Sequence, residues 1–158
     1  MNILLVNTTK MVGDTGGLAK VTSAFANEMH KRGHKVSVIY ADERSGDFFF
    51  PIDEDIKCYD VRLQNGKRIK YPLSLRLKRE FYRLFSKQKA RTVNSDFFYK
   101  YICPYMGKII KGIQPDIIVS FTPGTSKSLI IDLNLQDKVP IITMSHGNPE
   151  DYFVNLNQ

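Results

Sequence analysis

The pattern of hydrophobic and polar positions predicts an alternation of strands and helices. A short apolar run at residues 3–6 opens the chain, and a polar loop rich in Thr, Gly and Asp follows at residues 7–17. Apolar residues then recur at helical spacing over residues 18–29, and a Lys-Arg-Gly sequence provides the cations and the glycine that typically end a helix. Residues 36–40 form a second apolar run. This order predicts a β–loop–α–β unit with parallel strands.

The rest of the chain continues the alternation. A turn-rich acidic stretch at residues 42–60 holds a short strand at about 57–61. Two helices are predicted next, one in which Leu77, Phe81, Leu84, Phe85 and Gln88 share a face, and one at about 96–111 that Pro104 must kink or divide. A strand at 117–121, a Thr-Pro-Gly turn at 122–124, a helix at about 126–135 and a strand at 140–144 follow. The pattern therefore predicts an α/β fold, an open, mostly parallel sheet with helices on both faces.

Length and composition restrict the class of protein. The 158 residues have room for one domain, over residues 1–158. No stretch approaches the roughly 20 apolar residues of a membrane-spanning helix. The opening apolar run is too short for a signal peptide and has no basic segment before it. Cys58 and Cys103 lack metal-ligand spacing, so we expect free thiols in a reducing cytoplasm.

The positive charge is concentrated in one block. The chain has a formal net charge of +7, but residues 67–111 carry 13 Lys and Arg against only Glu80 and Asp96. We interpret this block as a basic helical insertion at about 67–111, and so uneven a surface typically faces phosphate groups or anionic lipid. A solvated helix face is one explanation; the other is a membrane-facing helix with basic residues around an apolar face, at Arg76, Lys78, Arg79, Arg83 and Lys87.

Three glycine-bearing loops follow predicted strands, at residues 8–17, 122–126 and 145–149. In a parallel sheet the carboxyl ends of the strands share one edge, and ligands bind there. We therefore expect the three loops to converge on a ligand. The residues of the second and third loops that we predict to contact a substrate or acceptor are Thr122, Gly124, Ser145, Gly147 and Asn148.

Gly16 and Gly17 stand where the first helix is predicted to begin. Glycine lets backbone N–H groups approach an anion, and a helix N-terminus adds partial positive charge, so a phosphate or diphosphate is the expected ligand. The alternative is that the two glycines only turn the chain into the helix. The loop matches neither the dinucleotide-binding G-x-G-x-x-G, which starts directly after a strand, nor the P-loop, because it lacks G-K-[ST].

The histidines differ in their expected roles. His146 directly follows a strand and precedes Gly147, so it can donate a hydrogen bond to a ligand hydroxyl or to developing negative charge. The alternative is a loop histidine with a structural hydrogen bond. His34 lies between helix and strand at the opposite edge of the sheet and is interpreted as structural, and His30 as a solvent-facing helical residue.

Taken together, these residues resemble the opening of the family-4 glycosyltransferases. The resemblance rests on the first strand, on Gly16 and Gly17, on M-H-K-R-G-H-K-V-S-V at residues 29–38, on Q-P-D-I-I-V-S at residues 114–120, and on His146-Gly147. It covers almost the whole chain. It implies the GT-B architecture, in which two Rossmann-like domains face each other across a cleft. The chain is similar to the N-terminal, acceptor-side domain alone, and the C-terminal donor-binding domain with its E-x7-E motif is expected to be absent.

The resemblance also implies roles for single residues. Gly16 and Gly17 would contact the donor diphosphate, and His146 would contact the transferred sugar near its reacting centre. The family generally transfers sugar with retention of configuration and without an essential metal, so no metal or other cofactor is expected beside the nucleotide-diphosphate sugar as co-substrate. Asp53-Glu54-Asp55 matches a D-x-D metal–nucleotide pattern, but it lies in an acidic turn with no strand beside it and is given no role.

The resulting hypothesis is the acceptor-binding half of a retaining, hexosyl-type glycosyltransferase, inactive without its second domain. We expect it to be cytoplasmic, peripheral at the inner face of the cell membrane, and to act on a glycan or lipid-linked acceptor in polysaccharide or glycolipid synthesis. The second hypothesis is a non-catalytic module whose basic segment binds nucleic acid, with Tyr71, Tyr82, Phe97, Tyr99 and Tyr101 stacking on bases. These aromatics share helical faces with aliphatic residues, which is typical of a core, so no nucleic acid is expected as a partner. A complete small nucleotide-binding protein is the third.

Overall fold

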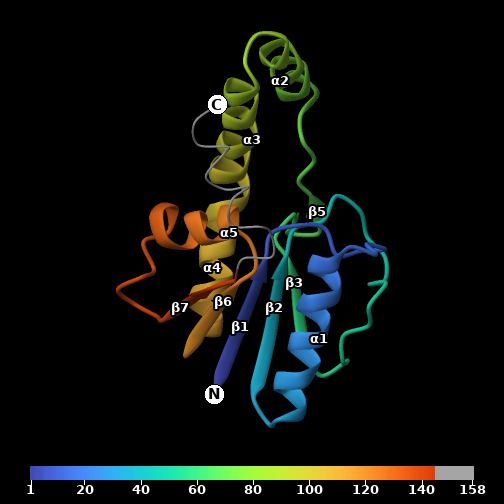
Figure 1. The fold of residues 1–158 in the computed structure, drawn as a ribbon, viewed down its shortest axis with the longest axis vertical. Helices are drawn as coiled ribbons and strands as arrows, with labels where there is room; N and C mark the ends of the chain where they lie inside the picture. Colours follow the sequence, from blue (N-terminus) through green and yellow to red (C-terminus); the bar gives the residue numbers. More distant parts are fainter. Residues whose placement is uncertain (145–158) are drawn as a thin grey trace.

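Five parallel strands form the central sheet of the computed structural model, which describes residues 1–144 (Figure 1). The order across the sheet is β3-β2-β1-β6-β7. The strands are β1 (Asn2–Asn7), β2 (Lys35–Tyr40), β3 (Lys57–Asp60), β6 (Ile117–Ser120) and β7 (Ile141–Thr143). Every neighbouring pair is parallel, which confirms the predicted α/β fold with an open sheet.

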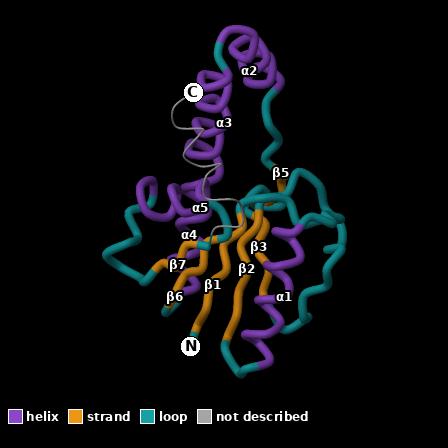
Figure 2. The backbone as a smooth tube through the Cα atoms, viewed as in Figure 1, coloured by secondary structure: helices purple, strands orange, loops and turns teal. Residues whose placement is uncertain are grey.

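Helices cover both faces of this sheet (Figure 2). Successive side chains of a strand point to opposite faces, so Ile3 and Leu5 of β1 pack in the cluster beneath α1 (Gly17–Lys31). Leu4 and Val6 pack in the other cluster, against α4 (Cys103–Ile113). An apolar side chain is needed at each position because both faces are buried, and this explains the continuous apolar run of β1.

The basic block contains one helix more than the sequence predicted. α2 (Leu73–Phe85) and α3 (Lys87–Phe97) form a hairpin that extends away from the sheet, and a wide turn, Phe98–Ile102, joins α3 to α4 (Figure 1). The break falls at Ser86, whose extended backbone ends α2 and whose hydroxyl caps α3 by accepting from the Lys89 amide. Lys87 and Gln88 therefore belong to α3, and assigning them to the first basic helix was wrong.

Two proline positions explain the remaining helix boundaries. Pro104 lies in the first turn of α4, where a missing N–H costs nothing, so it begins a helix and does not kink one. The Thr-Pro-Gly sequence is likewise the start of α5 (Pro123–Lys127), with Thr122 as its N-cap, and predicting a turn there was wrong. A wide helical turn, Ser128–Asp132, continues α5.

A short antiparallel hairpin, β4 (Leu63–Gln64) with β5 (Lys67–Arg68), joins the sheet to α2. Asn65 and Gly66 connect its strands with φ of 50° and 74°, the combination that a tight two-residue hairpin requires. Cys58 and Cys103 are free thiols, as expected, and burial raises the pKa of Cys103 to about 11. Among the described residues, no helix is both long and apolar enough to cross a membrane.

Candidate functional site

The chain changes direction across the sheet between β1 and β6. β2 and β3 lie on one side of β1, whereas β6 and β7 lie on the other, so the carboxyl ends of β1 and β6 form the topological switch point. The loop after β1 contacts α5 at this point, because the hydroxyl oxygens of Thr8 and Thr125 lie 2.6 Å apart. The Thr125 hydroxyl also lies 2.8 Å from that of Thr122. Two of the three predicted loops therefore meet as expected.

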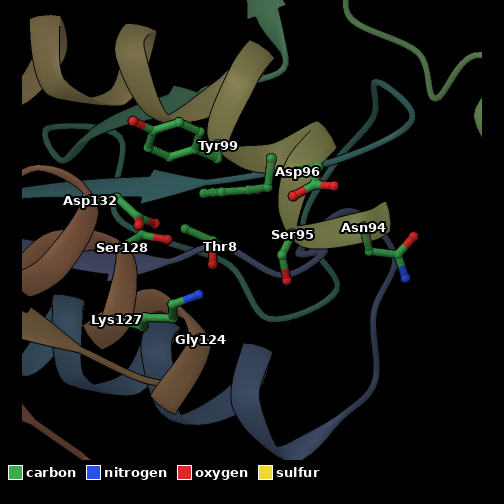
Figure 3. A pocket seen from close by; sticks show the side chains of 10 residues that line it. Thr8, Asn94, Ser95, Asp96, Tyr99, Gly124, Lys127, Ser128 and Asp132 are labelled. Atoms are coloured by element: carbon green, nitrogen blue, oxygen red, sulfur yellow. The ribbon is translucent and has the colours of Figure 1, made fainter. Parts of the chain in front are cut away.

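A pocket of about 470 Å³ opens beside this contact. Figure 3 shows Thr8 between α3 with the turn that follows it, on one side, and α5 with its continuation, on the other. We call it the switch-point pocket, and its lining residues are Thr8, Asn94, Ser95, Asp96, Phe98, Tyr99, Gly124, Lys127, Ser128 and Asp132. Hydroxyls, two carboxylates and one ammonium group thus surround a partly apolar space. Such a set can both accept hydrogen bonds from sugar hydroxyls and donate to sugar oxygens.

Sequence reasoning identified only part of this pocket. Gly124 and the loop containing Thr8 were predicted, whereas Asp96, Lys127 and Asp132 were missed. Helical spacing could have identified Lys127, because residues three or four apart share a helix face, as Gly124 and Lys127 do. It could not be used for Asp96, because the helix was expected to begin there and in fact ends one residue later, at Phe97.

Gly16 and Gly17 lie at the start of α1, at the same edge of the sheet, but they do not line the switch-point pocket. Gly16 is the N-cap and, as a glycine, has no side chain to accept from the first amides of α1, and the first turn holds no acidic residue. A Cβ added at Gly17 would meet nothing within 4 Å in the described structure, and Gly17 is not among the glycines with positive φ. Neither packing nor backbone conformation therefore requires a glycine at position 17. The Asp14 carboxylate lies beside Gly16, where an added Cβ would meet its Oδ2 at 3.2 Å, and it pairs with Lys10 at 3.3 Å.

Asp42 holds the loop between β1 and α1 in place. Its side chain is buried, and one carboxylate oxygen accepts hydrogen bonds from the amides of Met11 and Val12, each at 2.8 Å. The other oxygen accepts from the Arg44 amide at 3.2 Å. Burial acts to raise the pKa of Asp42, but the backbone N–H groups, those of Val12 and Met11 first, outweigh it, so the pKa is lowered. The sequence showed Asp42 only as part of an acidic stretch.

The lowered pKa of Asp42 makes the stability of the protein depend on pH. Because the folded pKa lies below the unfolded value of about 3.9, the carboxylate stabilises the fold fully above that value. This contribution is lost as the pH falls from about 4 through the folded pKa. We expect the free energy of unfolding, measured by urea denaturation from pH 6 down to pH 2, to fall more steeply for the native chain than for Asp42→Asn. If the free energy of unfolding fell equally with pH in the native chain and in Asp42→Asn, Asp42 would not be the source of the pH dependence.

The predicted basic residues do not all face solvent. Arg76, Lys78 and Arg83 are exposed on α2. Arg79 is half-buried, because it bonds to Glu80 at 2.7 Å and stacks over the Tyr71 ring, so it does not point outward like the others. The base-stacking alternative is weakened by the same packing. The ring centroids of Tyr71 and Phe97 lie 4.8 Å apart, and Phe97 is only 3% exposed, so neither ring is free to stack on a base.

The acidic turn lies far from these features. Asp53 and Asp55 approach His30 near the end of α1 and the start of β3, at the edge opposite the carboxyl ends. Local hydrogen bonds account for the turn, since the Asp53 carboxylate accepts from the Asp55 amide at 3.0 Å. His30 is half-buried, with its ring nitrogen 3.9 Å from Asp53, so it is less exposed than predicted. Ser145, His146, Gly147 and Asn148 lie outside the described residues, and their roles stay predictions.

Comparison with known proteins gives a consistent result. The sequence model of Glycosyltransferase Family 4 matches residues 15–158. A search of curated proteins finds no match. Among solved structures, the chain is similar to the glycosyltransferase SsfS6 of Streptomyces sp. SF2575 complexed with thymidine diphosphate, with a TM-score of 0.52 and 13% identity over 95% of this chain. A second structure of SsfS6 gives a TM-score of 0.45 and 12% identity over 90% of the chain. The chain spans 40% and 38% of the SsfS6 chain in those two structures.

Proposed function

Because the chain belongs to glycosyltransferase family 4, we propose that it is the acceptor-binding half of a retaining enzyme that moves a hexose from a nucleotide-diphosphate sugar. Its fold is that of the N-terminal domain of a GT-B glycosyltransferase. The observation that carries the proposal is the switch-point pocket, formed where the Thr8 and Thr125 hydroxyls join the β1 loop to α5. The pocket lies at the sheet edge where parallel α/β folds bind their ligands.

The donor side of the proposal rests on the start of α1. Cleaving the bond between sugar and diphosphate builds negative charge on the leaving oxygen, and free N–H groups at a helix N-terminus stabilise that charge. Gly17 is exposed and the first turn of α1 holds no acidic residue, while the Asp14 carboxylate beside Gly16 is paired with Lys10. The thymidine diphosphate bound to SsfS6 fits a nucleotide sugar as the co-substrate. We assign no metal ion or other cofactor to this step.

The acceptor side rests on the switch-point pocket. Asp96 and Asp132 supply hydrogen-bond acceptors for sugar hydroxyls, and Lys127 supplies a donor that also suits a phosphate. We propose a glycan or lipid-linked acceptor of polysaccharide or glycolipid synthesis, bound at the cytoplasmic face of the membrane. His146 would contact the transferred sugar, as the resemblance to the family implies. Closure of a second domain over this edge would exclude water from the activated sugar.

A lysine pair tests the acceptor assignment. In a two-domain enzyme containing this chain, Lys127→Ala should raise the KM for the acceptor about tenfold or more and leave the KM for the nucleotide sugar unchanged, because a hydrogen-bonded cation is lost. Lys138→Ala is the matched control, an exposed lysine outside the pocket, and should change neither value. Transfer of radiolabelled sugar, with the acceptor and the nucleotide sugar varied in turn, measures the two KM values. An unchanged acceptor KM in Lys127→Ala would remove the pocket from the acceptor site.

The need for a second domain has its own test. The 158-residue chain alone should bind no nucleotide sugar tightly and transfer no sugar, whereas the two-domain enzyme should turn over. Release of nucleoside diphosphate from a panel of nucleotide sugars measures this. Sustained turnover by the chain alone would contradict the need for a second domain, and tight binding of a nucleotide sugar by the chain alone would favour a complete small nucleotide-binding protein.

A further inference from the structure

The apolar side of α2 is unpaired in the described structure. Its large apolar residues recur every three or four positions and therefore form one face, with 59% to 81% of each side chain exposed. We call this the α2 apolar face, and it consists of Leu73, Leu77, Phe81, Leu84 and Phe85. All 13 residues of α2 are at least partly exposed. An exposed apolar stripe of this kind is typical of an interaction site.

The helix is nevertheless held in a defined position. Tyr71, just before α2, and Leu75 on its inner side pack against the main core, and α2 contacts α3 at the end of the molecule remote from the sheet (Figure 1). Arg79 stacks over the Tyr71 ring, which itself packs on Phe97. The apolar face is therefore presented outward by contacts on the other side of the helix.

A cation-lined groove lies between α2 and α3. Its volume is about 450 Å³, and its lining residues are Arg79, Arg83, Lys87, Ala90, Arg91 and Asn94; we call it the α2–α3 groove. Lys87 and Arg91 are exposed and four residues apart on α3, so their charges point the same way. Arg79 and Arg83 pair with Glu80 at 2.7 Å and 3.2 Å, whereas Lys87 and Arg91 form no ion pair among the described residues, so these two cations are the ones placed to bind phosphate oxygens.

The charges of the hairpin decide which partner fits the apolar face. Residues 73–97 carry seven Lys and Arg against Glu80 and Asp96. Two copies that paired through the α2 apolar face would bring like charges together. Nucleic acid would neutralise the cations but would leave five large apolar side chains in water. An anionic bilayer accommodates both features, because its surface attracts cations and its acyl boundary accepts apolar side chains.

We propose that α2 lies in the plane of an anionic lipid bilayer, with the α2 apolar face in the acyl boundary and lipid phosphates in the α2–α3 groove. Asn94 lines both that groove and the switch-point pocket, so the two are neighbours on α3. The bilayer surface is thereby placed beside the acceptor pocket. The further step, in which the bilayer delivers a lipid-linked acceptor to this pocket, rests on the proposed function.

Vesicle sedimentation of the 158-residue chain tests the apolar contact. We expect binding to vesicles containing phosphatidylglycerol, little binding to pure phosphatidylcholine, and loss of binding as salt rises. Leu84→Ser with Phe85→Ser should weaken binding about tenfold or more, since two large apolar side chains leave the acyl boundary. Ile131→Ser is the matched control, because Ile131 is an exposed apolar residue outside the hairpin, and should bind as the native chain does.

A second pair of variants tests the groove. Lys87→Gln with Arg91→Gln should weaken binding to anionic vesicles about tenfold, whereas Lys108→Gln with Lys111→Gln removes the same charge from α4 and should have a much smaller effect. Equal losses in the two double variants would overturn the groove assignment. Binding that ignores lipid charge, or survives the Leu84 and Phe85 substitutions, would overturn the proposal as a whole.

Two further measurements separate the competing partners. The first is a gel shift with a single-stranded oligonucleotide. If the chain bound the oligonucleotide more tightly than it binds vesicles, and the Leu84 and Phe85 substitutions left that affinity unchanged, the proposal would be overturned in favour of nucleic acid. Sedimentation showing a dimer that the Leu84 and Phe85 substitutions dissociate would overturn it in favour of self-association. Sugar transfer by the two-domain enzyme to a soluble acceptor should be unchanged in both hairpin double variants. Failure of membrane docking therefore leaves the transferase proposal standing, and the reverse also holds.

Discussion

A leucine in place of Gly17 should reduce sugar transfer by about a hundredfold or more while leaving the fold intact. A Cβ at this position meets nothing within 4 Å in the described structure, and Gly17 is the exposed first residue of α1. The substitution should therefore leave the free energy of unfolding unchanged or raise it by up to about 1 kcal/mol. Transfer should fall because the side chain blocks an anion from the first N–H groups of α1, and losing such donors typically costs that much.

Gly112→Leu is the matched control for this substitution. Gly112 lies in α4, and a Cβ there also has no neighbour within 4 Å in the described part of the chain, so its effect on stability should be similar. Transfer by the two-domain enzyme should be unchanged. Kinetics with varied nucleotide sugar and urea unfolding measure the two effects. If Gly17→Leu transferred sugar at the native rate, the start of α1 would not be the diphosphate site.

Replacing Asp42 by alanine should cost about 3 kcal/mol of stability, a large part of the 5–15 kcal/mol typical of a domain. The buried amides of Met11 and Val12 would lose a charged acceptor at 2.8 Å each. Asp42→Asn should cost less, because an amide oxygen still accepts a hydrogen bond. Asp47→Ala is the control on an exposed aspartate of the same loop region and should stay within about 0.5 kcal/mol of the native chain.

The Asp42 prediction also concerns function. Asp42 lines neither the switch-point pocket nor the first turn of α1, but it fixes the loop that joins β1 to α1, and Thr8 at the start of that loop lines the pocket. In the two-domain enzyme, Asp42→Asn should therefore lower transfer at a temperature where the variant is still folded. Circular dichroism at the assay temperature establishes that condition. A loss of stability with unchanged transfer would show that the loop position does not matter for the reaction.

Much of the sheet could be predicted because its signals are local. The run from Ile3 to Val6 is apolar throughout because both faces of β1 are covered, and the Lys-Arg-Gly sequence ends α1 within one residue of the expected position. The edge carrying the site followed from strand order alone, since parallel strands place their carboxyl ends together. The contact between Thr8 and Thr125 is the direct consequence.

The parts that could not be predicted depend on contacts between distant segments. The α2–α3 break at Ser86 has no glycine or proline to mark it, and only the structure shows that the backbone is extended there and that the serine hydroxyl caps a new helix. Asp42 is one acidic residue among several until the fold places Met11 and Val12 against it. Asp96 and Lys127 come from helices far apart in the chain, so no spacing in the sequence connects them.

The most direct test of the central claim is a structure of the two-domain enzyme bound to a nucleotide-diphosphate sugar and an acceptor. We expect diphosphate oxygens within about 3 Å of the backbone nitrogen at Gly17 and the acceptor in the switch-point pocket, beside Thr8 and Lys127. A donor bound at the opposite edge of the sheet, near His34 and Asp55, would contradict the account, because the carboxyl edge of β1 and β6 would then not be the site of transfer.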